Sequence, residues 1–305
     1  MLKCGVRTPF LSSELQQSFV RDGYVTVPLL SPDEVRYVAA ELQKLRPADN
    51  FRRRLKRRFL PGSLTYHCTF LDRNVEYKRR TRELIFELLR PRVGEVLDGY
   101  DFLNASFYVK PPGSGVFQVH QNWPHLTDMA DTTISIWCPL VDTDRHNGTI
   151  EVIPSSHKIV PDIACTNMPP FFDAFEETLI EKYLRPVPMK AGESLFFDDS
   201  LIHWSSENDS AEPRVAIQAI CLPAGAQPVY YHLDPARPDR FELFEVDPDY
   251  FITHTGDDLA DIPKERKSLG YVPNPNRSLT ETEFAERLAN GESTRRALWS
   301  GRTTA

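Results

Sequence analysis

The chain has 305 residues, and its 41% hydrophobic and 26% charged side chains are close to the averages of globular proteins. This composition supplies enough apolar side chain for a sizeable core and excludes a wholly disordered chain or a fibre. The formal net charge of −7 argues against nucleic acid or an anionic membrane surface as the main partner.

The cysteines are isolated and odd in number, and no two of them have C-x-x-C spacing: Cys4, Cys68, Cys138, Cys165 and Cys221. They therefore indicate neither a disulfide framework nor a cysteine zinc site, and a reducing compartment fits them best. No apolar run approaches the roughly 18 residues of a membrane-spanning helix, and the first ten residues lack the apolar segment of a signal peptide. We expect a cytoplasmic protein that binds no membrane.

The N-terminal third is expected to combine helices with a first strand. β-forming residues at 24–28 follow an Asp-Gly turn and predict a strand. Residues 31–34 (SPDE) have the pattern of a capping box with proline at the first helical position, so a helix is expected to run from there toward Leu45. Residues 79–97 also have apolar residues at helical spacing, and Pro91 is expected to kink or break that helix.

From Asp101 onward, short stretches rich in β-formers recur about every ten residues between Pro, Gly, Asn and Asp. The expected strands are 102–109, 132–140, 149–153, 193–197 and 215–222. This pattern is typical of an antiparallel sandwich or barrel, with residues 160–190 as an insertion. Residues after Ala224 are rich in Asp, Pro and aromatics without clear periodicity, and are expected to form an ordered extension that wraps the barrel.

Two histidines in this β-rich region, His120 and His203, are candidates for a metal site. Histidines on separate barrel strands can meet across the lumen, and imidazole nitrogens suit iron, zinc, copper and nickel. Two histidines and one carboxylate with open positions are the signature of non-haem Fe(II) oxygenases. An H-x-D pair supplies two of these ligands from one strand, because residues two apart point to the same side. Here the third position of that pair is Asn122.

Six segments in order resemble the phytanoyl-CoA dioxygenase-like family of Fe(II)/2-oxoglutarate oxygenases, over about residues 19–223. They read FVRDGYVTVPLLSPDEV, FYVKPPGSG, VHQNWPH, ISIWCPLVDTD, NGTIEVIPSSHK, and GESLFFDDSLIHWSSEN followed by PRVAIQ. The resemblance implies a mostly β fold with flanking helices, built on a double-stranded β-helix (jelly-roll, cupin-like) core. We expect one oxygenase-like domain over 1–305: N-terminal helices and first strand at 1–100, core at 101–223, and a C-terminal extension at 224–305.

The resemblance makes His120 and His203 iron ligands and places Asn122 where the family has its metal-binding aspartate. An amide oxygen is a neutral and weaker donor than a carboxylate, so iron should be held less tightly. Asn122 could ligate weakly, leave a position open to water or halide, or mark a protein that only binds ligands. A nearby carboxylate such as Asp128 could replace it if the chain loops back.

The resemblance also implies a cosubstrate pocket. Arg214 would grip the distal carboxylate of 2-oxoglutarate, since a guanidinium presents a planar fork of donors that matches a carboxylate. Ser205, two residues past His203, could add a hydroxyl to the same carboxylate. Lys110 and Trp137 match positions that line this pocket in relatives.

The implied reaction is oxidation of a small organic substrate by O2 at Fe(II), with 2-oxoglutarate as cosubstrate and hydroxylation as the usual outcome. Residues 51–59 (FRRRLKRRF) are interpreted first as charged surface, and alternatively as a mouth that attracts an anionic substrate. Two other functions stay open: a catalytically silent jelly-roll that binds a ligand, and halogenation, desaturation, epimerisation or cyclisation on the same scaffold.

Overall fold

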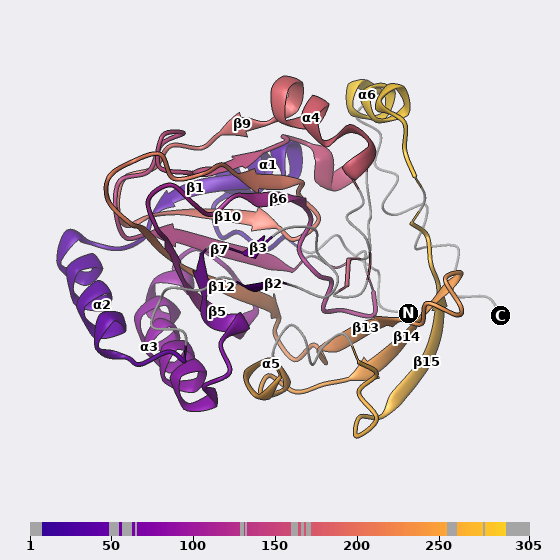
Figure 1. The fold of residues 1–305 in the computed structure, drawn as a ribbon, viewed down its shortest axis with the longest axis horizontal. Helices are drawn as coiled ribbons and strands as arrows, with labels where there is room; N and C mark the ends of the chain where they lie inside the picture. The colour runs from indigo at the N-terminus through magenta and orange to yellow at the C-terminus, as the bar shows by residue number, and fades with distance from the viewer. Residues whose placement is uncertain are drawn as a thin grey trace.

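The structure is a computed structural model, and it describes residues 8–48, 55–56, 63–64, 66–128, 131, 133–159, 164–165, 168, 172–254, 261–276 and 278–290. Its centre consists of two antiparallel sheets, with helices on one side and a third sheet near the C-terminal end (Figure 1). Among the described residues, no helix is long and apolar enough to cross a bilayer.

The larger sheet has six antiparallel strands in the order β1-β10-β7-β12-β5-β4. They are β1 (Tyr24–Pro28), β10 (Glu193–Asp198), β7 (Ile134–Pro139), β12 (Arg214–Pro223), β5 (Tyr100–Lys110) and β4 (His67–Cys68). The five strands expected after Asp101 include four of these, with bounds that shift by one or two residues. The smaller sheet has the order β6-β11-β8-β9. It consists of β6 (Phe117–His120), β11 (His203–Ser205), β8 (Ile150–Val152) and β9 (Arg185–Pro186).

The chain alternates between the two sheets, which is what makes the core a jelly-roll. It passes from β5 to β6, from β7 to β8 and from β10 to β11, each time from the larger sheet to the smaller one. Trp137 and Phe197 of the larger sheet pack in one buried cluster with Ile150 and Val152 of the smaller sheet. The expected double-stranded β-helix fold is therefore confirmed.

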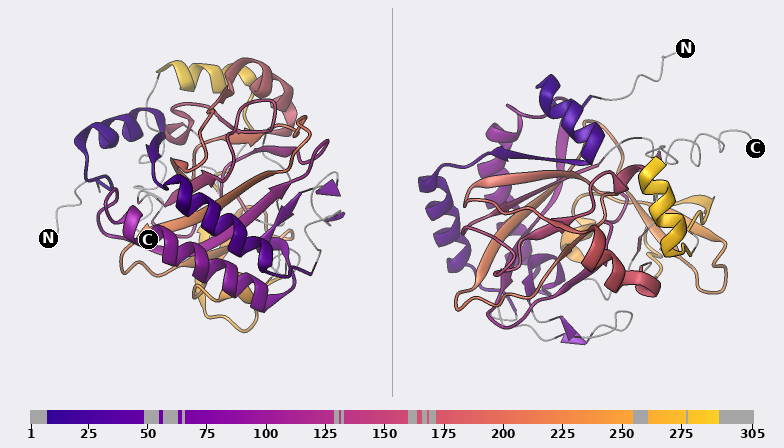
Figure 2. Two further views of the ribbon diagram at one scale, coloured as in Figure 1. Left: turned by 90° about the vertical axis from the view of Figure 1, so that its left-hand side faces the viewer. Right: turned by 90° about the horizontal axis from the view of Figure 1, so that it is seen from above.

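Helices cover the outer face of the larger sheet. They are α1 (Ser13–Asp22), α2 (Pro32–Lys44) and α3 (Val75–Val93), and Figure 2 shows α2 and α3 side by side across the strands. Val38, Leu42 and Ile85 from α2 and α3 pack in one buried cluster with side chains of the sheet such as Phe196. The predicted capping box of α2 is confirmed, because the Ser31 hydroxyl accepts from the Glu34 backbone N–H and the Glu34 side chain accepts from the Ser31 N–H.

The second predicted helix differs from the expectation at both ends. α3 begins at Val75, where the Asn74 side chain caps it by accepting from the Tyr77 N–H, and it continues through Pro91 to Val93. The expected break at Pro91 is wrong. Proline removes one helical hydrogen bond and crowds the preceding turn. Because Pro91 is only two residues from the end of α3, the helix continues to its end at Val93.

The C-terminal part forms a third sheet, which the sequence did not predict. It contains β13 (Val229–Leu233), β14 (Arg240–Glu245) and β15 (Ser268–Pro273), and it is followed by α6 (Glu281–Asn290). The other short elements are β2 (Leu55–Lys56), β3 (Ser63–Leu64), α4 (Glu176–Thr178), α5 (Tyr250–Thr253), a π-helix (Leu179–Tyr183), and 3-10 turns at Thr69–Leu71, Ser156–Lys158 and Asp173–Phe175.

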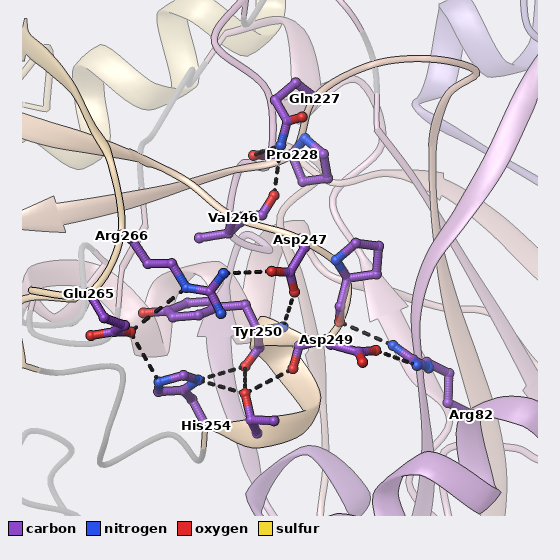
Figure 3. A network of polar contacts seen from close by, with 12 residues as sticks. Arg82, Gln227, Pro228, Val246, Asp247, Asp249, Tyr250, His254, Glu265 and Arg266 are labelled. Atoms are coloured by element: carbon purple, nitrogen blue, oxygen red, sulfur yellow. Dashed lines mark hydrogen bonds and ion pairs between the residues drawn. The ribbon is translucent and has the colours of Figure 1, made fainter.

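A polar network fixes α5 to α3 (Figure 3). The Arg82 guanidinium of α3 donates to the Asp249 carboxylate at 2.6 Å and to the Pro248 carbonyl at 3.1 Å. The Arg266 guanidinium pairs with Asp247 at 2.5 Å and lies over the Tyr250 ring, 5.1 Å from its centroid. These contacts join the C-terminal extension to the helical layer of the core.

Candidate metal and cosubstrate site

His120 and His203 lie directly opposite each other on neighbouring strands of the smaller sheet. His120 ends β6, His203 begins β11, and the two are register partners with ring centroids 4.0 Å apart. The expectation that the histidines meet across the lumen is therefore corrected, because β6 and β11 are adjacent in one sheet. Aromatic rings pack against both imidazoles: Phe117 stacks on His120 and Phe197 contacts His203 edge-on.

Hydrogen bonding fixes the tautomer of both imidazoles. The Nδ1 of His120 contacts the Gln118 carbonyl at 2.7 Å, and that of His203 contacts the Leu201 carbonyl at 2.9 Å. Because a carbonyl can only accept, Nδ1 carries the proton in each ring and Nε2 keeps its lone pair. Burial lowers the pKa of His203 to about 4, and burial together with the His203 ring holds the pKa of His120 well below its usual value. Both rings are therefore neutral near pH 7 and can offer Nε2 to a metal.

Asn122 lies two residues past the end of β6 and is held by the loop that follows β10. Its backbone N–H donates to the Asp199 carbonyl at 2.9 Å. Its side-chain Nδ2 donates to the Ser135 hydroxyl and to Asp199 Oδ1, each at 2.9 Å. Among the described residues, no hydrogen bond reaches the Asn122 amide oxygen. This oxygen is therefore the atom of Asn122 that is available to a ligand.

Asp199 is the carboxylate beside Asn122, and the sequence analysis missed it. Burial raises the pKa of Asp199 to about 6, against the hydrogen bonds from Ser135, Thr133 and Asn122 that favour the charged form. Asp128, the replacement considered from the sequence, is exposed. The signal for Asp199 in the sequence is weak: it is the second of two aspartates that end the apolar strand β10, four residues before His203.

Three of the four residues assigned to the cosubstrate pocket lie at the ends of β5, β11 and β12, and the fourth, Trp137, lies within β7. Lys110 and Arg214 are register partners on β5 and β12. The Lys110 ammonium donates to the Ser205 hydroxyl and the Ser206 carbonyl, each at 2.5 Å, and Arg214 Nη2 lies 3.5 Å from the same hydroxyl. The Arg214 guanidinium also lies over the Trp137 ring, 5.3 Å from its centroid.

This pocket contains two buried basic side chains without a carboxylate ion-pair partner among the described residues. Lys110 is 2% exposed and Arg214 is 5% exposed, and among the described residues neither forms an ion pair. Arg214 Nε is also buried without a hydrogen-bond partner. Burial lowers the pKa of Arg214 to about 10, and burial and then the Arg214 charge hold the pKa of Lys110 well below 10.5. Buried charges are costly unless they are paired, so the pocket is suited to an anion.

The anion pocket lies next to the histidine pair. His203 and Ser205 are both on β11, and residues two apart on a strand point to the same face about 7 Å apart. Gly148 closes the pocket behind Lys110: its φ is +75°, and a Cβ there would lie 2.9 Å from Lys110 Nζ and 2.6 Å from the Ser206 carbonyl oxygen. Strand β11 thus places the possible metal ligand His203 two residues from Ser205, whose hydroxyl contacts Lys110 and Arg214.

The chain is similar to known oxygenases. Residues 19–216 match the model of the phytanoyl-CoA dioxygenase (PhyH) family. The ectoine dioxygenase of Bordetella parapertussis is 26% identical over 263 residues, which cover 75% of this chain and 82% of that protein. The ectoine dioxygenase of Bordetella bronchiseptica is 25% identical over 261 residues, with the same coverage of 75% and 82%.

Solved structures show the same fold. The non-heme α-ketoglutarate-dependent carbocyclase SnoK from nogalamycin biosynthesis matches with a TM-score of 0.54 and 20% identity, covering 72% of this chain and 86% of SnoK. HygX from Streptomyces hygroscopicus, solved with nickel and 2-oxoglutarate, matches with a TM-score of 0.50 and 18% identity, covering 70% of this chain and 88% of HygX. Since the family model spans well over half of the sequence, the chain belongs to the phytanoyl-CoA dioxygenase family and is an Fe(II)/2-oxoglutarate-dependent oxygenase.

Proposed function

We propose that this oxygenase hydroxylates a small organic substrate, with Fe(II) held by His120, His203 and the amide oxygen of Asn122. The donor set fits such a metal, because two neutral imidazole nitrogens and one oxygen suit a non-haem iron site with open positions. The backbone carbonyls bound to Nδ1 of each histidine keep Nε2 free and fix the direction of each ring. Asn122 contributes a neutral oxygen in place of a carboxylate.

The pair of buried cations, Lys110 and Arg214, is the observation that carries this proposal. A bound anion would offset their charges, and both contact Ser205, which lies one strand repeat from His203. 2-Oxoglutarate is a dicarboxylate of five carbons, so it is long enough to reach from the histidine pair to these cations. In this arrangement the distal carboxylate replaces the missing ion-pair partner.

Each side chain of the pocket has a distinct task. Arg214 and Lys110 neutralise the distal carboxylate, and the Ser205 hydroxyl, which donates to the Gly148 carbonyl at 2.8 Å, holds the two cations together. The face of the Trp137 ring packs against the guanidinium of Arg214 in a cation–π contact. When bound, Fe(II) and 2-oxoglutarate supply the power to oxidise a substrate C–H bond with O2.

The substrate is expected to be small, and an anionic substrate is the alternative interpretation of the basic run in the sequence. The names of the relatives, ectoine dioxygenase and a carbocyclase of nogalamycin biosynthesis, support a small-molecule substrate. The basic run at residues 51–59 could attract an anion to the site, but its side chains lie outside the described residues. Substrate charge therefore rests on the sequence alone.

Anaerobic titration of the purified protein with Fe(II) and then 2-oxoglutarate tests the proposal. We expect the visible charge-transfer band of 2-oxoglutarate chelated to Fe(II), and its decay with formation of succinate when O2 is admitted. His203→Ala should abolish the band, whereas Arg214→Gln should shift its appearance to higher 2-oxoglutarate. A folded protein that gives no band at millimolar 2-oxoglutarate would contradict the proposal and favour the silent binding protein.

A further inference from the structure

We propose that Asp199 is a positioning residue that supplies the negative charge missing from the metal site, acting through the Asn122 amide. The inference rests on the proposed function, because it explains how Asn122 can serve where a carboxylate is expected. The carboxylate is present, but it lies one hydrogen bond behind the ligand atom. Asp199 fixes the amide and makes its oxygen a stronger donor.

Asn122 Nδ2 donates on the side that faces Asp199. It lies 2.9 Å from Asp199 Oδ1 and 2.9 Å from the Ser135 hydroxyl. Rotating the amide by half a turn would place its oxygen against the carboxylate oxygen, where two acceptors repel. The amide therefore has one orientation, in which its oxygen faces away from Asp199 and Ser135.

The surrounding hydrogen bonds enforce this orientation. Gln218 Nε2 donates to the Ser135 hydroxyl at 3.1 Å, so that hydroxyl accepts from Gln218 and Asn122. Its own hydrogen is directed to Asp199 Oδ1 at 2.6 Å. Asp199 Oδ1 thus accepts from both the Ser135 hydroxyl and the Asn122 amide. The chain of donors runs from Gln218 through Ser135 to Asp199, and it ends on the same oxygen that holds Asn122.

Asp199 does not occupy the ligand position itself. Asp199, His120 and His203 are all among the described residues, and no three His, Cys, Asp or Glu side chains in that part of the chain lie close enough together to hold a metal ion. The backbone bond from the Asn122 N–H to the Asp199 carbonyl fixes the two loops at this spacing. The charge of Asp199 therefore has to act through the amide.

The physical effect on a metal is twofold. Donation of an amide N–H to a carboxylate shifts electron density to the amide oxygen, as in other polarised hydrogen-bond chains. In addition, Asp199 is 3% exposed, and a negative charge in a buried site offsets a nearby metal charge more strongly than it would in water. Partners behind a ligand typically contribute about 10- to 100-fold to metal affinity.

The test is a titration with Co(II), which is stable in air and reports binding through its visible ligand-field bands. Four forms are compared: wild type, Asp199→Asn, Asn122→Asp, and the double variant that exchanges the two side chains. Asp199→Asn keeps the size of the side chain and an acceptor for both donors. We expect it to weaken Co(II) binding by about 10- to 100-fold. Asn122→Asp should raise the affinity more in the Asp199→Asn background than alone, because alone it places two carboxylates in contact.

Asp198→Asn is the matched control. Asp198 is an equally buried carboxylate one residue away, but it accepts from the Ser200 N–H at 2.8 Å and not from Asn122. Its substitution should lower Co(II) affinity by less than Asp199→Asn does, because Asp198 has no hydrogen bond to Asn122. Circular dichroism and thermal unfolding establish that each variant is folded, and recovery of binding in the exchanged variant excludes a general structural effect of Asp199→Asn.

Each other outcome overturns the inference in a recognisable way. A folded Asp199→Asn variant with wild-type Co(II) affinity shows that Asn122 needs no charged partner. Loss of binding without recovery in the exchanged variant shows that Asp199 serves packing and not charge. If wild type and His203→Ala bind Co(II) equally, the metal site of the proposed function is itself wrong, and the role of Asp199 is overturned with it.

Discussion

At the scale of single residues, the most costly group of the pocket is the buried Lys110 ammonium. Burial and the neighbouring Arg214 charge hold the Lys110 pKa well below 10.5, which means that the folded chain disfavours the charged form. This cost is tolerated in a site that is completed by an anion. Function at this position is therefore expected to oppose stability in the ligand-free protein.

Lys110→Met should raise the melting temperature of the ligand-free protein and reduce its further rise with 2-oxoglutarate. Because the folded pKa is depressed, the unfolded chain binds the proton more tightly, and wild-type stability should increase as the pH rises toward 10.5. This increase should be smaller in Lys110→Met. Thermal unfolding with and without 2-oxoglutarate from pH 7 upward measures all three effects. Lys190→Met, at an exposed lysine, is the control that should not change the response to 2-oxoglutarate.

Arg214→Gln should weaken 2-oxoglutarate binding by roughly 30-fold or more, because truncating one member of a buried charge pair costs about 2 kcal/mol or more. Metal affinity should stay at the wild-type level, since the guanidinium contacts Ser205 and Trp137 and not the histidines. Calorimetric titration of 2-oxoglutarate in the presence of Co(II) measures the change. Arg240→Gln, at an exposed arginine, is the control. An unchanged cosubstrate affinity would refute the role of Arg214.

The residues of the site differ in how far the sequence could predict them. Lys110, Trp137, Ser205 and Arg214 were assigned from the resemblance, and the structure brings them into one pocket. Asp199 could not be found in this way, because its partner Asn122 is 77 positions earlier in the chain. The contact joins the loop after β6 to the loop after β10, and no periodicity or motif specifies how two loops meet.

At the scale of elements, local signals predicted best where they are strong and close in sequence. The capping box of α2 was confirmed, as were the long strands of the larger sheet. β6 and β11 were missed as strands because they span only four and three residues. β13 of the third sheet was missed for another reason: all five of its residues are buried, so the alternation that reveals a half-buried strand is absent.

Ser31→Ala should lower the free energy of unfolding by about 1 kcal/mol, because it removes the side-chain cap of α2. Ser31 also accepts at 3.3 Å from the Glu34 N–H and donates at 2.8 Å to the carboxylate of Glu34. Ser12→Ala is the matched control: Ser12 caps α1 through a long contact of 3.4 Å to the Leu15 N–H, so its loss should cost less. Urea denaturation of the three proteins gives the order, and an equal cost for both serines would contradict it.

At the scale of the whole molecule, the Arg82–Asp249 contact lies apart from the hydrogen bonds of the ligand site. The histidines lie in the smaller sheet, whereas Lys110 and Arg214 end strands of the larger sheet, so a metal with 2-oxoglutarate would tie the two sheets together. The extension is tied to α3 by Arg82 and Asp249, which share no hydrogen-bond partner with the site among the described residues (Figure 3). The extension also contacts the loop after Asn122, because the Val229 N–H donates to the His125 carbonyl at 2.9 Å and the Tyr231 hydroxyl donates to the Leu126 carbonyl at 2.8 Å.

Because Arg82 and the site share no hydrogen-bond partner among the described residues, their effects on stability should be additive. In the presence of Co(II), 2-oxoglutarate at 100 times its dissociation constant should further stabilise the wild type by about 2.7 kcal/mol, the value for one bound ligand. Arg82→Ala should cost about 1 kcal/mol, because the Arg82 side chain is only 14% exposed in its pair with Asp249, and the cost should be the same with and without ligand. Chemical denaturation of wild type and Arg82→Ala, each with and without ligand, measures the four free energies of unfolding that are needed. A cost that changes by more than about 0.5 kcal/mol on ligand binding would show that α3 and the extension are coupled to the site.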